Sequence, residues 1–525
     1  MNSLKVLDVT LRDGGCVNNF DFGQDYMEKI LCALEHSGVE HIELGYLDQK
    51  KGSVQGRTQY CNEKVIPQHF LKKKKAGVTY VAMMDYGKFD VDALGVREPG
   101  GIDGIRLAFH KKDRKKIAEL GHIIMSKGYQ FFIQPMITLR YSDQELLELI
   151  EMVNTELADA SGFYIVDSFG EMRPNDMNRV LNLVDHNLMP SMTLGFHSHN
   201  NLQMSYSNAI SFVQFPTNRN LMLDCSIMGM GKGAGNLNTE LLLEHLNLYY
   251  GKGYTTAPLL SVIDQVINQL HSEFYWGYAV EYYLSAINQC TPSYAGHFFN
   301  KHMLPIDQVG ELLSMIREDK KISFDRDYAE SLYYNYNASR EYDDSDSVAH
   351  LREWFKEKTI LLIGPGKSVE KDRDKILAKI NESDTISISV NYTGLFSTDL
   401  VFVTRAELLS RLDSVSAITM SNIASESKKN LYVISYKKWA VAEGTTKDSA
   451  GVILLHLLSK CSVKEAVLAG FDGFVPNIND NYFDRAMRHP VTETQANERN
   501  RWFKEYIRKM SDFMRISFLT DSLYQ

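Results

Sequence analysis

Cysteine is scarce in this chain, which contains six among 525 residues. They lie far apart, at none of the short spacings that are typical of a zinc site or a disulfide framework. They are Cys16, Cys32, Cys61, Cys225, Cys290 and Cys461. We therefore expect a reducing compartment, and the sequence indicates neither a disulfide-stabilised secreted domain nor a cysteine-ligated metal.

Long apolar runs and an excess of positive charge are missing as well. No stretch approaches the ~18 consecutive apolar residues of a membrane-spanning helix. Residues 1–5 lead straight into a strand pattern without a charged-then-apolar leader. The formal net charge is -9, which argues against a general nucleic-acid binder. These absences predict a cytoplasmic protein with no membrane span and no nucleic-acid partner.

Residues 1–250 alternate short apolar runs with longer amphipathic stretches. This alternation is typical of a parallel sheet with crossover helices. Eight such units in this length favour a closed (β/α)8 TIM barrel over an open sheet. The expected strands are residues 6–10, 41–47, 80–85, 104–109, 129–137, 163–168, 192–199 and 221–228.

The second half of the chain divides into three parts by composition. Residues 251–340 read as a mostly helical, aromatic-rich extension of the barrel that also suits the interface of a homo-oligomer. Residues 341–355 are polar and predict a linker. Residues 356–525 alternate strands and helices again, which predicts a Rossmann-like α/β domain.

Several polar residues lie where expected barrel strands end. Arg12 and Asp13 follow the first run and precede two glycines, whereas His197 and His199 end the seventh run and, at this spacing, share one face. Asn236 follows the eighth run in a glycine-rich segment. The carboxyl ends of barrel strands meet at one mouth. A carboxylate, two imidazoles and an amide oxygen there predict an open divalent-metal site.

Four segments carry a resemblance to a known group of enzymes. They are residues 10–14 (TLRDG), 167–168 (DS), 195–202 (GFHSHNNL) and 235–240 (GNLNTE). Together they resemble the DRE-TIM metallolyase superfamily, which includes 4-hydroxy-2-oxovalerate aldolase, hydroxymethylglutaryl-CoA lyase and the isopropylmalate synthases. The resemblance covers residues 1–250. It implies Mn2+ or Mg2+, with Zn2+ or Co2+ as alternatives, that chelates a 2-oxo acid while a carbon–carbon bond is made or broken.

The resemblance also implies roles for individual residues. Arg12 would stabilise the enolate, while Asp13, His197, His199 and Asn236 would hold the metal. Ser168 matches a position that helps to hold the substrate carboxylate. Two residues have alternative interpretations: Glu43 either supports the site as a catalytic carboxylate or forms a structural salt bridge, and Arg106 either binds a second carboxylate or phosphate of the substrate or forms an ion pair at a strand end.

Cys16 departs from the aldolase pattern. The aldolases have a histidine at this position, thought to move the proton of the substrate hydroxyl. A thiol with an ordinary pKa is a poor general base at neutral pH. Either Cys16 is unusually acidic and catalytic, or another residue does this work, for which we consider His41, His110, Tyr278 and Tyr282. The substrate is therefore not expected to be hydroxy-oxovalerate itself.

The C-terminal part has its own candidate site. Gly364, Gly366 and Ser368 follow an expected strand, where backbone amides can face a phosphate at a helix N-terminus. Residues 448–452 (DSAGV) and 467–474 (VLAGFDGF) resemble the bacterial family 42 sialyltransferases over 355–525. This resemblance implies a site for a CMP-linked acidic sugar, with Gly364, Gly366, Ser368, Asn391, Ser449 and Gly451 lining it and His489 as the base for the acceptor hydroxyl.

The sequence thus favours an aldolase-type carbon–carbon lyase or synthase for a pyruvate-like 2-oxo acid and an aldehyde or sugar. The C-terminal domain would handle a nucleotide-activated sugar in surface-polysaccharide biosynthesis. Two alternatives stay open at this point. One is a Claisen-type acyl-CoA condensing enzyme, and the other is an aldolase whose C-terminal domain is a non-catalytic binding module.

Overall fold

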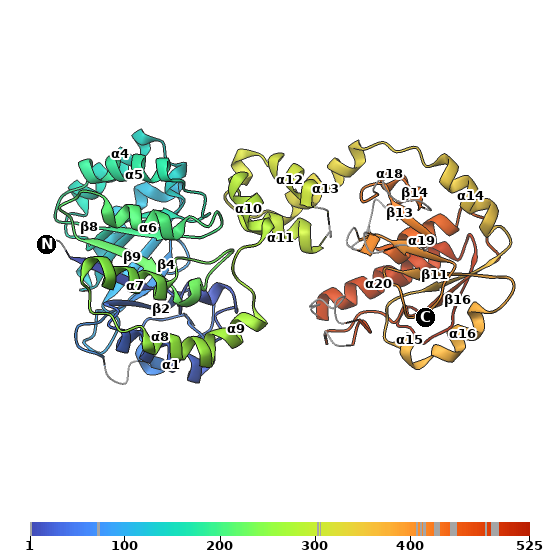
Figure 1. The fold of residues 1–525 in the computed structure, drawn as a ribbon, viewed down its shortest axis with the longest axis horizontal. Helices are drawn as coiled ribbons and strands as arrows, with labels where there is room; N and C mark the ends of the chain where they lie inside the picture. The colour runs from blue at the N-terminus through green and yellow to red at the C-terminus, as the bar shows by residue number, and fades with distance from the viewer. Residues whose placement is uncertain are drawn as a thin grey trace. The chain divides into compact units, whose positions relative to one another are not determined.

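The computed structural model describes residues 3–70, 74–301, 304, 306–405, 408–409, 412, 416–424, 431–440, 449–477, 480–484 and 493–525. The chain forms two compact units (Figure 1). Unit 1 comprises Met1–Ala295 and Arg317–Phe324, and unit 2 comprises Gly296–Ile316 and Asp325–Gln525. Within the described part, no helix is long and apolar enough to cross a membrane.

Unit 1 is built around an eight-stranded parallel barrel, as predicted. Neighbouring strands follow chain order, and β1 pairs with both β9 and β2, which closes the barrel. A short strand, β3 (Gln59–Tyr60), adds to β2. The barrel strands are β1 (Leu4–Asp8), β2 (His41–Leu47), β4 (Thr79–Asp85), β5 (Gly104–Phe109), β6 (Gln130–Pro135), β7 (Gly162–Asp167), β8 (Thr193–Ser198) and β9 (Leu221–Cys225).

Helices cover the outside of the barrel and bury its outward-facing apolar residues. They are α1 (Gln24–Ser37), α2 (Val65–Phe70), α3 (Ile117–Ser126), α4 (Asp143–Glu156), α5 (Pro174–Asn187), α6 (Ser205–Gln214) and α7 (Thr239–Tyr250). The start of α4 shows why the sequence folds this way. Ser142 accepts from the Glu145 amide, and Glu145 accepts from the Ser142 amide, so the two residues form a capping box at the start of the helix.

The barrel interior has a separate apolar core beneath the mouth. Its members are Leu7, Val9, Val81, Phe132, Tyr164, Val166 and Met222. Gly195 makes room for one of them, because a Cβ atom there would lie 2.4 Å from Cε1 of Tyr164. The strands are buried on both faces, as parallel barrel strands must be, and this explains their nearly continuous apolar sequences.

The segment after the barrel differs from the predicted extension. It contains α8 (Ala257–Val262), α9 (Asn268–Glu273), α10 (Val280–Ile287), α11 (Pro292–Gly296), α12 (Ile306–Ser314) and α13 (Arg326–Ser339). It is helical, but it is divided between the two units rather than belonging to the barrel as a whole. Most of the predicted linker at residues 341–355 is helix α14 (Ser345–Phe355), whose Val348, Leu351 and Phe355 are buried, so the linker prediction was wrong there.

Unit 2 contains a separate seven-stranded parallel sheet with the order β14-β13-β12-β11-β10-β15-β16. The order reverses between β10 and β15, which are adjacent. The strands are β10 (Thr359–Ile363), β11 (Thr385–Val390), β12 (Leu400–Val403), β13 (Ala417–Met420), β14 (Leu431–Ile434), β15 (Glu465–Ala469) and β16 (Arg515–Phe518). The accompanying helices include α15 (Ser368–Lys371), α16 (Arg373–Ile380), α18 (Tyr436–Trp439), α19 (Ala450–Leu458) and α20 (Glu493–Met510).

Candidate metal centre

Asp13, His197 and His199 come together at the carboxyl ends of the barrel strands. All three are buried, and one ligand atom from each lies within 4.8 Å of the other two. Asp13 is held in a turn after β1, where its amide donates to the carbonyl of Val9 at 2.8 Å. The two imidazole centroids are 5.3 Å apart. The fold therefore gathers three of the four residues that sequence reasoning named as metal ligands.

The protonation states of this cluster suit a cation. Burial raises the pKa of Asp13, but the neighbouring His199 and Arg12 lower it, and the net pKa is well below the usual range. Burial lowers the pKa of His199 to about 4. At neutral pH the site thus presents a carboxylate and an unprotonated imidazole, as a divalent metal requires.

His197 is oriented by a second carboxylate. Its Nδ1 atom lies 2.9 Å from Oδ2 of Asp224, so Nε2 is left as the donor atom of this ring. Asp224 lies on β9 next to β8 and is buried. Nδ1 of His199 lies 3.1 Å from the carbonyl oxygen of Lys232 and 3.9 Å from Oδ2 of Asp13. Sequence reasoning missed Asp224. The one feature that could have pointed to a role in the site was the position of an aspartate within an otherwise apolar strand.

Asn236 joins the cluster through its amide. Nδ2 donates to Oδ2 of Asp13 at 2.7 Å and to the carbonyl of Met230 at 3.1 Å. The buried Oδ1 has no hydrogen-bond partner among the described residues. Gly231 is close by, and a Cβ there would lie 2.3 Å from Nδ2 of Asn236. A metal ion would satisfy the orphaned oxygen, so the donor set fits the expected cation.

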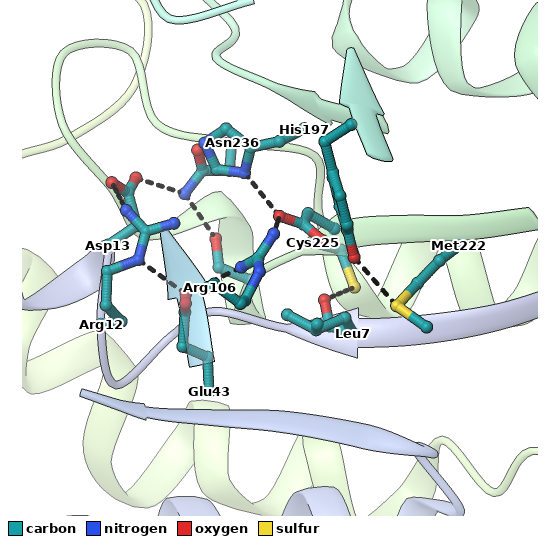
Figure 2. Close-up of polar contacts among 12 residues, drawn as sticks. Leu7, Arg12, Asp13, Glu43, Arg106, His197, Met222, Cys225 and Asn236 are labelled. Carbon is teal, nitrogen blue, oxygen red and sulfur yellow. Dashed lines mark hydrogen bonds and ion pairs between the residues drawn. The ribbon is translucent and has the colours of Figure 1, made fainter. Parts of the chain in front are cut away.

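A chain of buried charges supports the centre from below the mouth (Figure 2). Nε of Arg12 donates to Oε2 of Glu43 at 2.6 Å, and Nη1 of Arg12 donates to Oδ1 of Asp13 at 2.8 Å. Glu43 has no exposed surface. This geometry agrees with the structural salt-bridge interpretation of Glu43, which contacts Arg12 and Arg106 and does not border the cavity described below.

Arg106 continues this chain and corrects one prediction. It has no exposed surface; Nη1 lies 3.0 Å from Oε2 of Glu43, and Nη2 donates to Asp224. Its guanidinium lies 4.7 Å from the centroid of the Tyr164 ring. The substrate-binding interpretation of Arg106 was wrong, because the side chain points into the barrel and is enclosed by its own partners.

A cavity opens above this cluster, and unit 1 alone lines it. Arg12, Asp13, His197 and His199 border it. Ser168 also borders it, and its Oγ accepts from the Ile137 amide at 3.0 Å. Further lining residues include Cys16, Phe20, Tyr46, Asp48, Asp85, Lys88, His110, Gln134, Lys232 and Phe324.

Cys16 borders the cavity but carries a proton at neutral pH. Burial and the nearby Asp13 carboxylate raise the pKa of its thiol to about 12. These surroundings raise the thiol pKa rather than lower it, which opposes the alternative of an unusually acidic Cys16.

Of the four other bases that the sequence suggested, His110 borders the cavity. His41 begins β2, at the opposite end of the barrel, and packs against Phe132. Tyr278 and Tyr282 belong to unit 1 but do not line the cavity.

The structure shows a pair that sequence reasoning missed. Asp85 at the end of β4 and Tyr46 near the end of β2 both border the cavity, and burial together with the Asp85 carboxyl raises the pKa of the Tyr46 phenol. Their position at strand ends was the one signal that could have identified them.

Unit 2 has a cavity of its own beside the point where the strand order reverses. Gly366, Asn391, Ser449 and Gly451 line it, together with aromatic side chains that include Phe471 and Tyr482. Oδ1 of Asn391 accepts from the Thr404 amide at 2.9 Å, so this side chain also holds the end of β11 to β12.

The backbone amides of two other residues in unit 2, which were predicted to face a phosphate, are already engaged in hydrogen bonds within the protein. The amide of Gly364 donates to Ala469 at 2.7 Å, and that of Ser368 donates to Oδ2 of Asp472 at 2.8 Å. A Cβ at Gly364 would lie 2.6 Å from the carbonyl oxygen of Gly470, so this glycine serves a close approach of two loops. The predicted phosphate cradle at residues 364–368 was wrong in this respect. His489 lies outside the described residues.

Comparisons with known proteins agree with this geometry. A family model described as HMGL-like matches residues 108–262. The 4-hydroxy-2-oxovalerate aldolase 2 of Comamonas testosteroni is 30% identical over 244 residues, which cover 46% of this chain and 67% of that protein. The aldolase 2 of Dechloromonas aromatica (strain RCB) is 29% identical over 267 residues, 50% of this chain and 76% of that protein.

Among solved structures, the HMG-CoA lyase of Brucella melitensis matches 51% of this chain and 100% of its own, with a TM-score of 0.41 and 15% identity. The sequence relatives, rather than this likeness, decide the assignment. Through its barrel, the chain belongs to the HMGL-like (DRE-TIM) family, which includes 4-hydroxy-2-oxovalerate aldolases.

Proposed function

We propose that unit 1 is a divalent-metal-dependent aldolase that makes or breaks a carbon–carbon bond between a pyruvate-like 2-oxo acid and an aldehyde or sugar. One observation carries the proposal. Arg12 is fixed between Glu43 and Asp13, and it borders the same cavity as the Asp13, His197 and His199 cluster. Aldolase relatives at about 30% identity support the same reaction class.

The chemistry needs a place for developing negative charge. When a 4-hydroxy-2-oxo acid is cleaved, the bond between C3 and C4 breaks and its electron pair moves to form the enolate of the 2-oxo acid, while the hydroxyl proton leaves and C4 becomes an aldehyde. A bound divalent metal would supply Lewis-acid polarisation of the 2-oxo group. The Arg12 guanidinium, held by two carboxylates, offers preorganised positive charge to the enolate oxygen.

Ser168 completes the part of the site that would hold the 2-oxo acid. Ser168 borders the cavity directly after the end of β7, where its hydroxyl can meet the substrate carboxylate. The rest of the lining is polar and carries both signs of charge, including Asp85, Lys88 and His110. Such a surface suits an aldehyde with several hydroxyl groups better than acetaldehyde, and it supports a sugar or sugar-like electrophile.

Exchange of the methyl protons of pyruvate tests the proposal. The metal-loaded full chain in D2O should exchange these protons in a chelator-sensitive manner, with no CoA ester present. A Claisen-type condensing enzyme would instead show no pyruvate exchange and would depend on acetyl-CoA. That outcome would exclude the aldolase and favour the second candidate.

We propose further that unit 2 binds a nucleotide-activated sugar, most simply a CMP-linked acidic sugar, so that the whole chain would serve surface-polysaccharide biosynthesis. The cavity supports this, because ligands of open parallel sheets bind outside the carboxyl ends of strands where the order reverses. Phe471 and Tyr482 offer aromatic faces for a base, and Ser449 precedes the N-terminus of α19.

Calorimetry of CMP binding to the full chain tests this second proposal. Heat that saturates, and that a substitution such as Gly451→Leu abolishes, would support it, because a side chain at 451 would meet Phe471 in the cavity. No heat with CMP or other nucleotides would refute it. Release of CMP from a CMP-linked sugar would distinguish a transferase from a non-catalytic binding module.

A further inference from the structure

The segment after β9 forms an arch beside the metal centre. This arch comprises residues 226–236 and begins directly after the last residue of β9. The Ser226 amide donates to the carbonyl of Leu237 at 2.9 Å. Within the arch, the Asn236 amide donates to the carbonyl of Gly229, also at 2.9 Å. The arch is therefore a closed loop, and the contacts that hold its backbone decide where its polar groups lie.

Two carbonyl groups of the arch bond to residues of the metal centre. The carbonyl of Met230 accepts from Nδ2 of Asn236 at 3.1 Å, and the same Nδ2 donates to Oδ2 of Asp13 at 2.7 Å (Figure 2). The carbonyl oxygen of Lys232 lies 3.1 Å from Nδ1 of His199. A shift of the arch would therefore turn the Asn236 amide and the His199 ring away from their present directions.

Met228 holds the arch in an unfavourable backbone conformation. Its φ is 50° and its ψ is 27°, in the left-handed region that a residue with a side chain adopts only at an energetic cost. Gly229, Gly233 and Gly235 also have positive φ values, but glycine bears no such cost. The Met228 amide donates to Oε2 of Glu240 at 3.0 Å, outside the arch. The conformation of Met228 thus depends on partners from other segments.

Trp276 supplies the partner for the Met228 carbonyl. It follows α9 in unit 1, is 3% exposed, and donates from Nε1 to this carbonyl at 2.9 Å. Its ring also approaches the far side of the arch, because a Cβ at Gly235 would lie 3.4 Å from Cδ1 of Trp276. The Trp276 carbonyl lies 2.9 Å from Nε2 of His271, and the two rings meet edge to face with centroids 4.5 Å apart. One fixed side chain thus contacts the arch at two places.

We propose that Trp276 is a positioning residue of the metal centre, which fixes the arch whose carbonyls face Asn236 and His199. Trp276 does not border the cavity, so it acts through the arch and not by contact with substrate. The segment that follows the barrel thereby contributes to the metal centre at the mouth of the barrel. The inference rests on the metal-dependent aldolase function proposed above.

Calorimetric Mn2+ titration of the full chain tests the inference. Trp276→Phe keeps an aromatic ring and removes the N–H that bonds to Met228, so Mn2+ affinity should fall about 10-fold, the lower end of the effect of losing a partner behind a metal ligand. Trp439→Phe is the matched control, because Trp439 is also 3% exposed and donates from Nε1 to Asp344 in unit 2. The control should keep the Mn2+ affinity of wild type. Thermal unfolding without metal records the stability of both variants.

Two further measurements separate positioning of the metal centre from a general effect on folding. The electron paramagnetic resonance spectrum of Mn2+ bound at saturation should differ between wild type and Trp276→Phe, whereas that of Trp439→Phe should match wild type. The double variant Trp276→Phe with Met228→Gly should regain at least about threefold in Mn2+ affinity over Trp276→Phe, because glycine adopts the left-handed conformation without the Trp276 bond.

Several results would overturn the inference. They are a Mn2+ affinity of Trp276→Phe within about twofold of wild type, an equal loss of affinity in Trp439→Phe, an unchanged spectrum of bound Mn2+ in Trp276→Phe, or no recovery in the double variant. If the wild-type protein itself does not bind Mn2+, the proposed metal-dependent function fails and this inference falls with it. Binding by wild type with no effect of Trp276→Phe refutes the inference alone.

Discussion

Nδ1 of His197 lies 2.9 Å from Oδ2 of Asp224, and both side chains are buried. This contact fixes which nitrogen of His197 is free for a metal. Asp224→Asn should therefore weaken Mn2+ affinity about 10- to 100-fold, the usual effect of losing a carboxylate behind a metal-bound histidine. Calorimetric Mn2+ titration measures it.

Asp185→Asn provides the matched control for Asp224→Asn. Asp185 also pairs with an arginine, Arg219, but at a position remote from the centre. Its substitution should lower thermal stability and leave Mn2+ affinity unchanged. Equal affinities for wild type and Asp224→Asn would show that Asp224 does not orient the ligand.

Glu43 holds Arg12 without bordering the cavity. Glu43→Gln keeps the shape of the side chain but removes the negative charge that holds the Arg12 guanidinium. We therefore expect kcat to fall about 10-fold or more while Mn2+ affinity changes by less than about threefold. Steady-state kinetics beside a metal titration check this split. A loss of metal binding equal to the loss of rate would mean that Glu43 supports the ligands instead of Arg12.

Arg106 balances two buried carboxylates, Glu43 and Asp224. Arg106→Met should cost about 3–5 kcal/mol of unfolding free energy, because it leaves buried charge without compensation. Denaturant unfolding measures this cost.

The exposed pair of Arg179 with Asp143 supplies the comparison for Arg106. Arg179→Ala should cost less than about 1 kcal/mol, as exposed ion pairs do. A stable Arg106→Met protein with a raised KM for the 2-oxo acid would restore the substrate-binding interpretation.

The Cys16 thiol should react slowly with alkylating agents at neutral pH. Since its pKa is raised to about 12, the neutral form dominates below that pH and the reactive thiolate increases with pH. Iodoacetamide should modify Cys16 far more slowly at pH 7 than it modifies a free thiol of pKa ~8.5, with a rate that rises about tenfold per pH unit. Mass spectrometry of the Cys16 peptide follows this.

Replacement of Cys16 gives an independent check. Cys16→Ser should keep turnover within about threefold, because the thiol transfers no proton in the proposed reaction. A loss of 100-fold, or rapid alkylation at pH 7, would assign the base role to this residue after all.

Much of the fold of unit 1 could be predicted because each barrel strand is recognisable from a short stretch of sequence. Parallel strands buried on both faces give apolar runs, and the expected run at 41–47 coincides with β2 while that at 104–109 coincides with β5. Asp13, His197 and His199 could be found because strand ends of a barrel share one mouth.

Other features depend on partners that are distant in sequence. Arg106 was ambiguous because an arginine in a barrel strand faces either the mouth or a buried carboxylate. The choice depends on Glu43 and Asp224, 63 and 118 positions away in the chain. Asp85 and Tyr46 border one cavity from two different strands, and the sequence could not pair them for the same reason. In unit 2, the Ser368 amide donates a hydrogen bond to Asp472. The local sequence around Ser368 gives no sign of this partner, because Asp472 is distant in the chain.

The exchange of pyruvate methyl protons in D2O, followed by NMR in wild type, Asp13→Asn and Arg12→Lys with their metal contents measured in parallel, tests the central claim most directly. The account predicts metal-dependent exchange in wild type, loss of both metal and exchange in Asp13→Asn, and retained metal with exchange slowed about 100-fold or more in Arg12→Lys. Exchange at the wild-type rate in both variants, or none in the metal-loaded wild type, would contradict it.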